Sequence, residues 1–527
     1  MTAGREDWGT LEHESEEQQR TAANGDPGAY HGKIAAAELH WHDPKSRCWL
    51  NADSQSGEWN GFNSADGTPA GDPPPASWSP WDSAFDDHSA PFFRWFTGAT
   101  TNACFNEIDR HVLNGKGAHC AFVFEGDRWD PSLNDGQGGP VQQREVSYRE
   151  FLLETVIRAQ VLSNLGLQKG DRVAFNLPSI PEQIFYTEAA KRLGIIYTPV
   201  FGGFSAKTLS DRICDAGASV VVTADGGYRN AEVVPFKEIY ADPALDNYIP
   251  LPAALKALRE VLDEHDLGDF TETTSQQVAD ALRGEITIER SDVMRELGKA
   301  LSGDRGAQLD PAQTAQIRTD VARRLSGVGH IVKKVVVVRH TGQDIVQQSR
   351  DQWSADLVAA ATEQVLAKAG EALGDGTATS RESLLALGDT ELWRALNASQ
   401  PAIPVPADWP LFIIYTSGST GKPKGVVHTH GGWLAGITHT LRTVFNAQAD
   451  DRIYVIADPG WITGQSYLMA APFSFGITSI IVEGSPLFPH AGRFSSIIER
   501  HGATIFKAGS TFLKAVMTDP ASTRDMA

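Results

Sequence analysis

Hydroxyl, glycine and lysine residues are concentrated in residues 415–425, directly after the apolar segment 411–414. Glycines let the backbone turn so that its N–H groups approach an anion, while hydroxyls add donors and lysines add positive charge. The pattern therefore predicts a loop that holds a polyphosphate, built from Thr416, Ser417, Gly418, Ser419, Thr420, Gly421, Lys422 and Lys424. It is not a Walker loop, which would need glycine at Thr416 and serine or threonine at Pro423.

This loop resembles that of the adenylate-forming superfamily, and most closely that of the acetyl-CoA and propionyl-CoA synthetase branch. Other segments share the resemblance, namely 95–98, 200–205, 222–226, 339–342, 350–353, 457–467 and 483–486. The resemblance implies that the loop binds the outer phosphates of ATP while a carboxylate attacks the α-phosphorus and Mg²⁺ offsets the developing charge. ATP, Mg²⁺ and coenzyme A are therefore the expected cofactors, and a small carboxylic acid is the expected substrate.

The segment around Trp461 resembles the part of the family that lines the acyl pocket. By that resemblance Trp461, Ile462 and Thr463 line the pocket, and a bulky Ile462 beside Trp461 favours a short acyl chain. Without the resemblance, Trp461 and Ile462 would be read as core residues.

Coenzyme A is expected, again by resemblance, at Gly203, Arg229 and Thr463. Arg229 corresponds to an arginine near the 3′-phosphate, and a guanidinium suits phosphate because it can donate two parallel hydrogen bonds. Two positions depart from the family pattern. Glu232 stands where the family has a second basic residue, and Leu487 stands where it has a polar one. Taken alone, Arg229 would be read as a surface residue.

Two histidines, His428 and His430, follow the loop and could suggest a general base or a metal pair. The attacking carboxylate is already anionic and needs no base, so we expect them to pack at the start of a helix. No metal site and no disulfide framework are predicted, because the four cysteines are scattered: Cys48, Cys104, Cys120 and Cys214.

Composition narrows the class of protein. The 527 residues are 41% hydrophobic and 21% charged, which is typical of a globular protein with two or more domains. A net charge of −20 argues against nucleic acid as a partner, and the apolar stretches are too short for a membrane span. The first thirty residues lack the pattern of a secretory signal, so a cytoplasmic location is expected.

Helices and strands alternate after residue 146. Helical spacing over 148–165 and 184–193 alternates with apolar strands at 171–177, 195–200 and 220–223. The predicted fold class is therefore α/β, an incomplete adenylate-forming N-terminal domain whose parallel sheets are covered by helices. The expected divisions are a turn-rich lead-in that docks on the main domain (1–90), a first α/β subdomain (91–250), a helical insert (251–329), a return strand region (330–354), a second helical insert (355–400) and an incomplete phosphate-loop subdomain (401–527).

The two inserts are rich in alanine, leucine and charged residues. Asp310 followed by Pro311 predicts a helix start, because the aspartate can accept from first-turn amides and proline suits the first helical position. The insert over 251–329 is expected to be structural or an interaction surface rather than catalytic.

The resemblance also implies residues that the chain does not show. The family's magnesium-binding glutamate and its catalytic lysine are expected beyond Ala527, so the chain is expected to be an inactive part of a longer protein. The inserts raise the possibility of a ligase module in a fusion such as propionyl-CoA synthase, with further catalytic domains. A carrier-loading adenylation domain and a non-catalytic scaffold are the alternatives.

Overall fold

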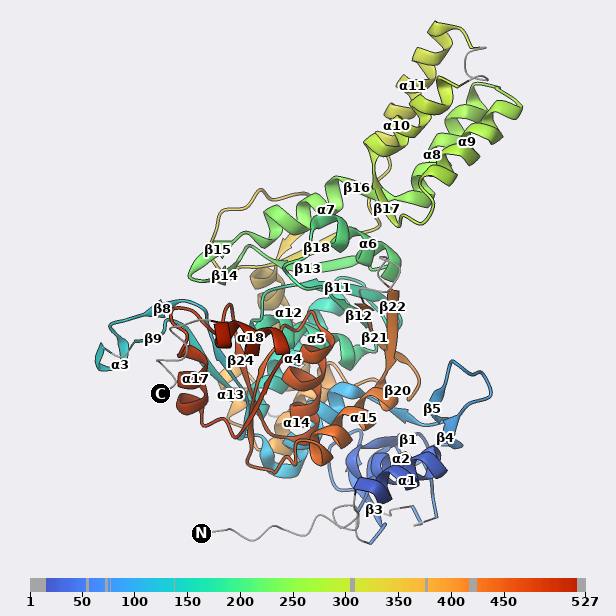
Figure 1. Ribbon diagram of the computed structural model, residues 1–527. Helices are drawn as coiled ribbons and strands as arrows, with labels where there is room; N and C mark the ends of the chain where they lie inside the picture. The colour runs from blue at the N-terminus through green and yellow to red at the C-terminus, as the bar shows by residue number, and fades with distance from the viewer. Residues whose placement is uncertain are drawn as a thin grey trace.

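The computed structural model describes residues 16–53, 56–71, 74–75, 77–136, 138–303, 309–374, 378–416 and 424–518. Its larger sheet has seven strands in the order β19-β18-β13-β11-β12-β21-β22 (Figure 1). In chain order these are β11 (Arg172–Asn176), β12 (Ile196–Pro199), β13 (Val220–Ala224), β18 (Lys334–Val338), β19 (Asp351–Trp353), β21 (Pro410–Thr416) and β22 (Lys424–Thr429). All neighbours are parallel except β21 and β22, so the predicted α/β class is confirmed.

A second sheet has five strands in the order β10-β7-β24-β23-β25. They are β7 (Cys120–Glu125), β10 (Gln143–Ser147), β23 (Arg452–Ile456), β24 (Thr478–Val482) and β25 (Ile505–Ala508). Here β7 pairs in parallel with β24 from the far end of the chain, and β10 alone is antiparallel. The described chain thus returns to its first α/β region to complete this sheet.

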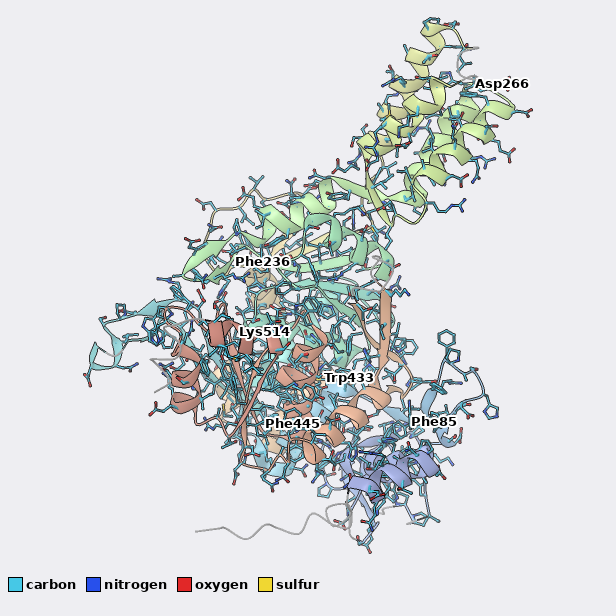
Figure 2. The ribbon with its side chains drawn as sticks, in the orientation of Figure 1. Phe85, Phe236, Asp266, Trp433, Phe445 and Lys514 are labelled. Carbon is cyan, nitrogen blue, oxygen red and sulfur yellow. The ribbon has the colours of Figure 1, made fainter. Side chains whose placement is uncertain are left out.

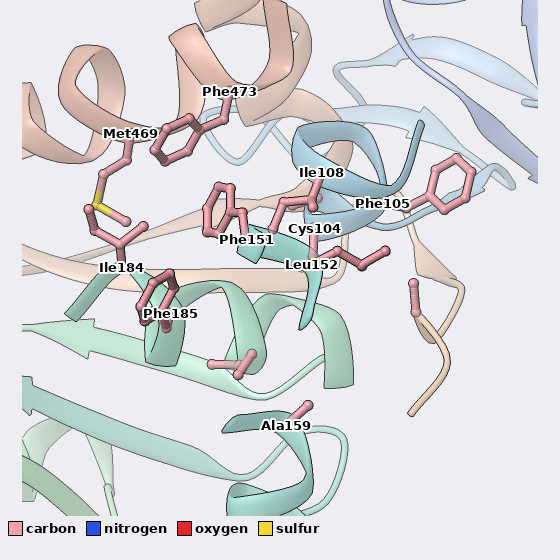
Figure 3. Packing of buried hydrophobic residues seen from close by; sticks show 14 of the residues in the cluster. Cys104, Phe105, Ile108, Phe151, Leu152, Ala159, Ile184, Phe185, Met469 and Phe473 are labelled. Carbon is pink, nitrogen blue, oxygen red and sulfur yellow. The ribbon is translucent and has the colours of Figure 1, made fainter. Parts of the chain in front are cut away.

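Two helices, α4 (Tyr148–Asn164) and α5 (Pro181–Leu193), form the buried centre of the molecule. Side chains on all their faces are buried, because α4 and α5 lie in the main hydrophobic cluster together with strands of both sheets. Figure 3 shows the packing, in which the Phe151 and Phe473 ring centroids are 5.0 Å apart.

The outer faces of the sheets are covered as well. In β13, Val222 enters the central cluster while its neighbour Val221 packs with Leu209 and Ile213 of α6 (Ala206–Ala216). Helix α17 (Arg493–His501) covers the outer face of the smaller sheet through Ile497. This layering holds the ends of both sheets in fixed positions.

The N-terminal region packs on the same core. It contains α1 (Glu16–Gly25), α2 (Pro27–Glu38), β1 (Trp41–Asp43), β2 (Cys48–Ala52) and β3 (Trp59–Asn63), so the part described is more regular than a turn-rich lead-in. Three tryptophans are buried in the central cluster: Trp41, Trp49 and Trp59.

The helical stretch 251–329 forms a four-helix bundle that projects from the body (Figure 1). Its helices are α8 (Leu251–Glu264), α9 (Asp269–Ala281), α10 (Arg290–Leu301) and α11 (Pro311–Ser326), and they enclose a hydrophobic cluster of their own. A short pair, β16 (Tyr248–Pro250) and β17 (Thr287–Glu289), joins the bundle to the body. The predicted cap is confirmed, since Asp310 accepts from the N–H groups of Ala312 and Gln313 at 2.7 and 2.8 Å. Asp266 at the far end of the bundle lies well away from Phe236 in the body (Figure 2).

The second helical stretch is built differently. Its helices are α12 (Ser354–Leu373), α13 (Arg381–Leu385) and α14 (Asp389–Ser399), and both α12 and α14 pack on α4. Ala361, Val365 and Trp393 belong to the central cluster rather than to a separate one. None of the helices in the described ranges is both long enough and apolar enough to cross a bilayer.

Short elements complete the described chain. They are β4 (Ser83–Asp86), β5 (Arg94–Thr97), β6 (Thr100–Thr101), β8 (Trp129–Asp130), α3 (Leu133–Gly136), β9 (Gly139–Pro140), β14 (Gly227–Arg229), β15 (Glu232–Val234), α7 (Asp242–Asp246), β20 (Val405–Pro406), α15 (His430–Thr443), α16 (Ala471–Phe475) and α18 (Ser510–Thr518), with π-helical turns at Phe105–Asp109, Val112–Lys116, Lys237–Ala241 and Gly464–Ala470.

Candidate functional site

A cavity of ≈ 320 Å³ lies beyond the carboxyl ends of strands from both sheets. Ser179 and Gly203 follow β11 and β12 of the larger sheet, while Asp458 and Glu483 follow β23 and β24 of the smaller one. Arg229, at the end of β14, completes this set. The carboxyl ends of parallel strands are the usual place for a ligand in such folds, so this cavity is the first candidate for a binding site.

Glycines allow the two exit loops to meet at the cavity. A Cβ added at Gly460 would lie 2.4 Å from the Cα of Phe201, and one at Gly202 would lie 2.4 Å from the ring of Phe236. A larger residue at position 460 would push the loop after β23 away from the loop after β12, and one at position 202 would displace the Phe236 ring. Glycine at positions 202 and 460 therefore allows the walls of the cavity to lie close together.

Glu483 connects three elements on the cavity wall. It is 1% exposed, and its Oε1 accepts from the Tyr228 N–H at 2.8 Å and contacts His340 Nε2 at 2.9 Å. Burial disfavours the charged form of His340, but the hydrogen bond and charge of Glu483 outweigh burial and raise the pKa of His340. The second oxygen, Oε2, has no hydrogen-bond partner among the described residues. Glu483 is thus a buried acceptor with spare capacity.

Asp458 supplies a second carboxyl to the cavity. Burial raises the pKa of Asp458 to about 6, against the opposing effect of the Gly460 N–H at 2.6 Å and the Ser179 hydroxyl at 3.5 Å. A carboxyl of this kind can accept or release a proton near neutral pH.

Asp225 fixes the edge of the site at the end of β13. Its carboxylate accepts from the N–H groups of Gly226, His340, Thr341 and Gly342 at 2.7 to 3.0 Å. These bonds hold the loop after β18 against β13, and so they position His340 beside Glu483. Segments 222–226 and 339–342 both share the family resemblance, but no sequence pattern predicts this contact between them.

The predicted polyphosphate loop connects β21 to β22. Thr416 is the last residue of β21 and Lys424 the first of β22, and they are exposed register partners. Ser417, Gly418, Ser419, Thr420, Gly421 and Lys422 lie outside the described residues. Because β21 runs parallel to β12, its carboxyl end faces the same edge of the sheet as the cavity. Before the loop, the Tyr415 hydroxyl donates to Asp215 at 2.7 Å, which anchors the end of β21 on α6.

The predicted acyl-pocket residues lie beside the cavity rather than on its lining. The Trp461 ring centroid is 5.7 Å from that of Phe201, a lining residue, and 5.3 Å from that of Phe204. Trp461 and Ile462 are 41% and 40% exposed, so they are not core residues. Thr463 precedes the π-helical turn Gly464–Ala470. Their role in binding an acyl group stays a prediction.

Two of the three residues expected at coenzyme A are brought together. Gly203 and Arg229 both line the cavity, although 26 positions separate them in the sequence. Thr463 is not in the lining. Arg229 is exposed, and it is the one arginine or lysine among the residues of the described chain that line the cavity.

The two histidines after the loop have the packing role that was expected. His430 begins α15 and is buried, and its Nδ1 accepts from the Ala103 N–H at 3.0 Å. Burial lowers the pKa of His430 to about 3. His428 stacks on Phe412, with ring centroids 4.7 Å apart. His430 therefore packs at the start of α15, whereas His428, on β22, packs on β21.

One group of possible metal ligands occurs within the described ranges, formed by Asp86, Asp87 and His88. It lies near the tip of the β4–β5 hairpin, and Asp86 is already hydrogen-bonded to His88 at 2.7 Å. No further feature at this exposed hairpin points to an ion. All four cysteines are free thiols.

The fold and the cavity define the class of protein as an α/β protein with a candidate site beyond the ends of its parallel strands. Sequence comparison agrees, since the chain belongs to the family of AMP-binding enzymes, whose model matches residues 126–302 and 319–526. A second model, the N-terminus of acetyl-coenzyme A synthetase, matches residues 77–106 and places the chain in that branch.

Curated relatives support the same branch. Acetyl-coenzyme A synthetase of Streptomyces avermitilis is 31% identical over 82% of this chain and 47% of its own length. The enzymes of that name from Cupriavidus metallidurans and Methylobacillus flagellatus are 30% and 32% identical over 83% and 84% of this chain, and 47% and 48% of their own lengths. The chain thus spans about half the length of the curated relatives it matches.

Proposed function

We propose that this chain takes part in the ATP-dependent activation of a short-chain carboxylate, first to acyl-AMP and then to acyl-CoA. The observation that carries the proposal is the shared sheet edge, where the ends of the predicted phosphate loop and the cavity with Gly203 and Arg229 lie on the same side. Family membership supports the class of reaction, an AMP-forming acid–CoA ligase.

Each cofactor has a stated role in this proposal. The loop from Thr416 to Lys424 would hold the outer phosphates of ATP, and Mg²⁺ would offset their charge. A carboxylate oxygen attacks the α-phosphorus and pyrophosphate leaves, after which the coenzyme A thiol displaces AMP from the acyl group. Acetate, propionate and 3-hydroxypropionate are the candidate acids, and Ile462 beside Trp461 favours such short chains.

Three finer points stay predictions. The first is that this chain alone would turn over little. The second is that further catalytic domains occur in the same parent chain, as in a propionyl-CoA synthase-like protein. The third is a cytoplasmic location, which the four free thiols support.

Binding of Mg·ATP to the 527-residue chain, measured by calorimetry, tests the nucleotide part. We expect Lys424→Ala to weaken binding roughly ten-fold, because it removes a charge from the loop. Lys256→Ala is the matched control, since Lys256 is an exposed lysine on α8. Absence of Mg·ATP binding by the parent chain, or equal losses in both variants, would overturn the proposal.

Pyrophosphate release with each acid, with and without coenzyme A, tests the reaction. Robust acid-dependent release would support the ligase and refute the expectation of an inactive part. Failure of free coenzyme A to accept the acyl group would favour a carrier-loading adenylation domain. A partner held by residues 251–329 without ATP binding would favour a scaffold.

A further inference from the structure

Two buried carboxyl groups and one lysine meet in the centre of the body. Glu107 lies in the π-helical turn Phe105–Asp109, while Glu188 and Lys191 lie one turn apart on α5. All three side chains are at most 1% exposed. The Lys191 Nζ donates to Glu107 Oε2 at 2.6 Å and to Glu188 Oε1 at 2.7 Å. Two acids therefore share one cation in the interior, where water cannot offset the charge that is left over.

The two carboxyl groups also contact each other. Glu107 and Glu188 lie within side-chain hydrogen-bond reach, yet Glu107 Oε1 and Glu188 Oε2 have no donor among the described residues. Ionised carboxylates only accept hydrogen bonds, so this contact would bring two like charges together if both groups were charged. A proton on one of them turns the contact into a hydrogen bond and leaves one carboxylate for one lysine.

The charged side chains nearby are already engaged. Asp109 and Arg192 form an ion pair with each other at 2.7 Å. The Arg110 guanidinium donates to the backbone carbonyls of Glu38 and Ser474. Burial raises the pKa of a thiol and two phenols that face the group and lowers the pKa of an imidazole, so that all four are neutral at pH 7: Cys104, Tyr148, Tyr197 and His430. Within the described part of the chain, a proton is thus the remaining means of balancing the second carboxylate.

We infer that Glu107 and Glu188 share a single proton at neutral pH, and that this proton makes the centre of the body sensitive to alkaline pH. Its loss would leave two carboxylates on one lysine. The charges of the group act on Tyr197 of the adjacent strand β12. The Tyr197 hydroxyl donates to Gln465 at 2.8 Å, and Gln465 donates at 2.5 Å to the Pro459 carbonyl in the loop after β23. The shared proton therefore lies beside the strand and the loop that lead to the cavity.

The sign of the pH dependence follows from the raised pKa of Glu107. Burial, and after it the charge of Glu188, raise this pKa well above the ordinary value of 4.5, so the folded state binds the proton more tightly than the unfolded state does. The stabilisation is fully present below pH 4.5 and is lost as the pH rises toward the folded pKa. Because the proton belongs to the pair, replacing either glutamate should abolish this dependence.

Glutamine substitutions test the inference on the 527-residue chain. The amide of glutamine can accept from Lys191 and donate to the remaining carboxylate, so it reproduces a protonated glutamate. We expect Glu107→Gln and Glu188→Gln each to keep or raise the urea midpoint of the body at pH 8, and to take up about one proton fewer on folding at pH 7. Urea unfolding at several pH values measures both quantities. Glu125→Gln is the matched control, since Glu125 is equally buried but contacts two arginines, and its loss should lower the midpoint.

The double variant gives the converse test. Glu107→Gln combined with Glu188→Gln leaves Lys191 buried without a carboxylate, so its midpoint should fall below that of either single variant. If a single variant loses as much as Glu125→Gln, or takes up as many protons on folding as the parent, both glutamates are ionised and the inference is overturned. A double variant as stable as the single ones would overturn it too, because Lys191 would then need neither partner.

Discussion

Two helical stretches of similar composition have different structural roles in this protein. The stretch 251–329 forms a bundle whose apolar residues pack on one another, and it meets the body at a short two-stranded base. The stretch 355–400 places α12 and α14 against α4, within the central cluster. Alanine- and leucine-rich helices therefore do not reveal whether they form a separate unit. Whether such helices form a separate unit depends on which apolar surface is available for them to pack against.

The difference has a physical consequence for stability. Helices α12 and α14 lie in the same hydrophobic cluster as the sheets that position the cavity. A destabilising substitution in these helices should therefore also destabilise the candidate site. The bundle shares few contacts with the body, and polar links such as Lys207 to Glu285 at 3.1 Å form much of its base. A destabilising substitution in the bundle should therefore lower the stability of the bundle and leave that of the body unchanged.

The largest expected effect is in the second stretch. Trp393 is buried, and its Nε1 donates to Asp109 at 2.7 Å. Trp393→Ala should lower the free energy of unfolding of the body by about 3–5 kcal/mol, because it leaves a cavity and an unsatisfied carboxylate oxygen. Chemical denaturation measures the loss. Trp393→Phe keeps most of the ring and should lose less, and a loss below 1 kcal/mol in the alanine variant would show that α14 is not part of the core.

A smaller effect is expected in the bundle. Leu258 is fully buried in the separate cluster. Leu258→Ala should cost about 2–3 kcal/mol of bundle stability, the low end for such a change, since a small bundle can relax around the gap. Hydrogen exchange should accelerate in α8–α11 and stay unchanged in α4 and α5. Faster exchange in α4 would show that the bundle and the body unfold together, which would contradict the separate stability expected of the bundle.

What the sequence could predict follows from the distance over which each signal acts. The Asp310 cap and the strands expected at 171–177 and 195–200 depend on neighbours a few residues apart. The strands are observed at Arg172–Asn176 and Ile196–Pro199, close to the predicted bounds. Glu125 is different. Its partners Arg493, Arg500 and His501 lie on α17, more than 350 residues later, and contact it at 3.2, 2.6 and 3.0 Å. No local pattern signals such a network.

The same reasoning applies to the site. The glycines and lysines of the phosphate loop are adjacent, so a single sequence suffices to propose their chemistry. The contacts of Asp127 and Asp225 could not be predicted, because each carboxylate accepts from backbone N–H groups of loops that fold back from elsewhere. Backbone donors carry no residue type, and they leave no trace in the pattern of side chains.

A third prediction concerns the cap of α11. Asp310→Ala should cost about 1 kcal/mol of bundle stability, because two first-turn N–H groups lose their acceptor. Exchange at Ala312 and Gln313 should rise most. Asp310→Asn retains an acceptor oxygen and serves as the control, so equal losses in the two variants would point to charge rather than capping.

The smallest expected effect is a change in how the stability of the body depends on pH, through His340 and Glu483. Glu483 raises the pKa of His340 above 6.5, so the folded state binds a proton more tightly than the unfolded state does. That stabilisation is fully present below pH 6.5 and is lost as the pH rises through the folded pKa. Glu483→Gln removes the ion pair, so burial, the largest influence on His340, is then opposed by the smaller effects of the Glu182 and Asp225 charges. The pKa of His340 should fall below 6.5, and stability should instead rise with pH toward 6.5. Denaturation between pH 5 and 8 measures both slopes. Equal slopes in the two proteins would show that Glu483 does not control this histidine.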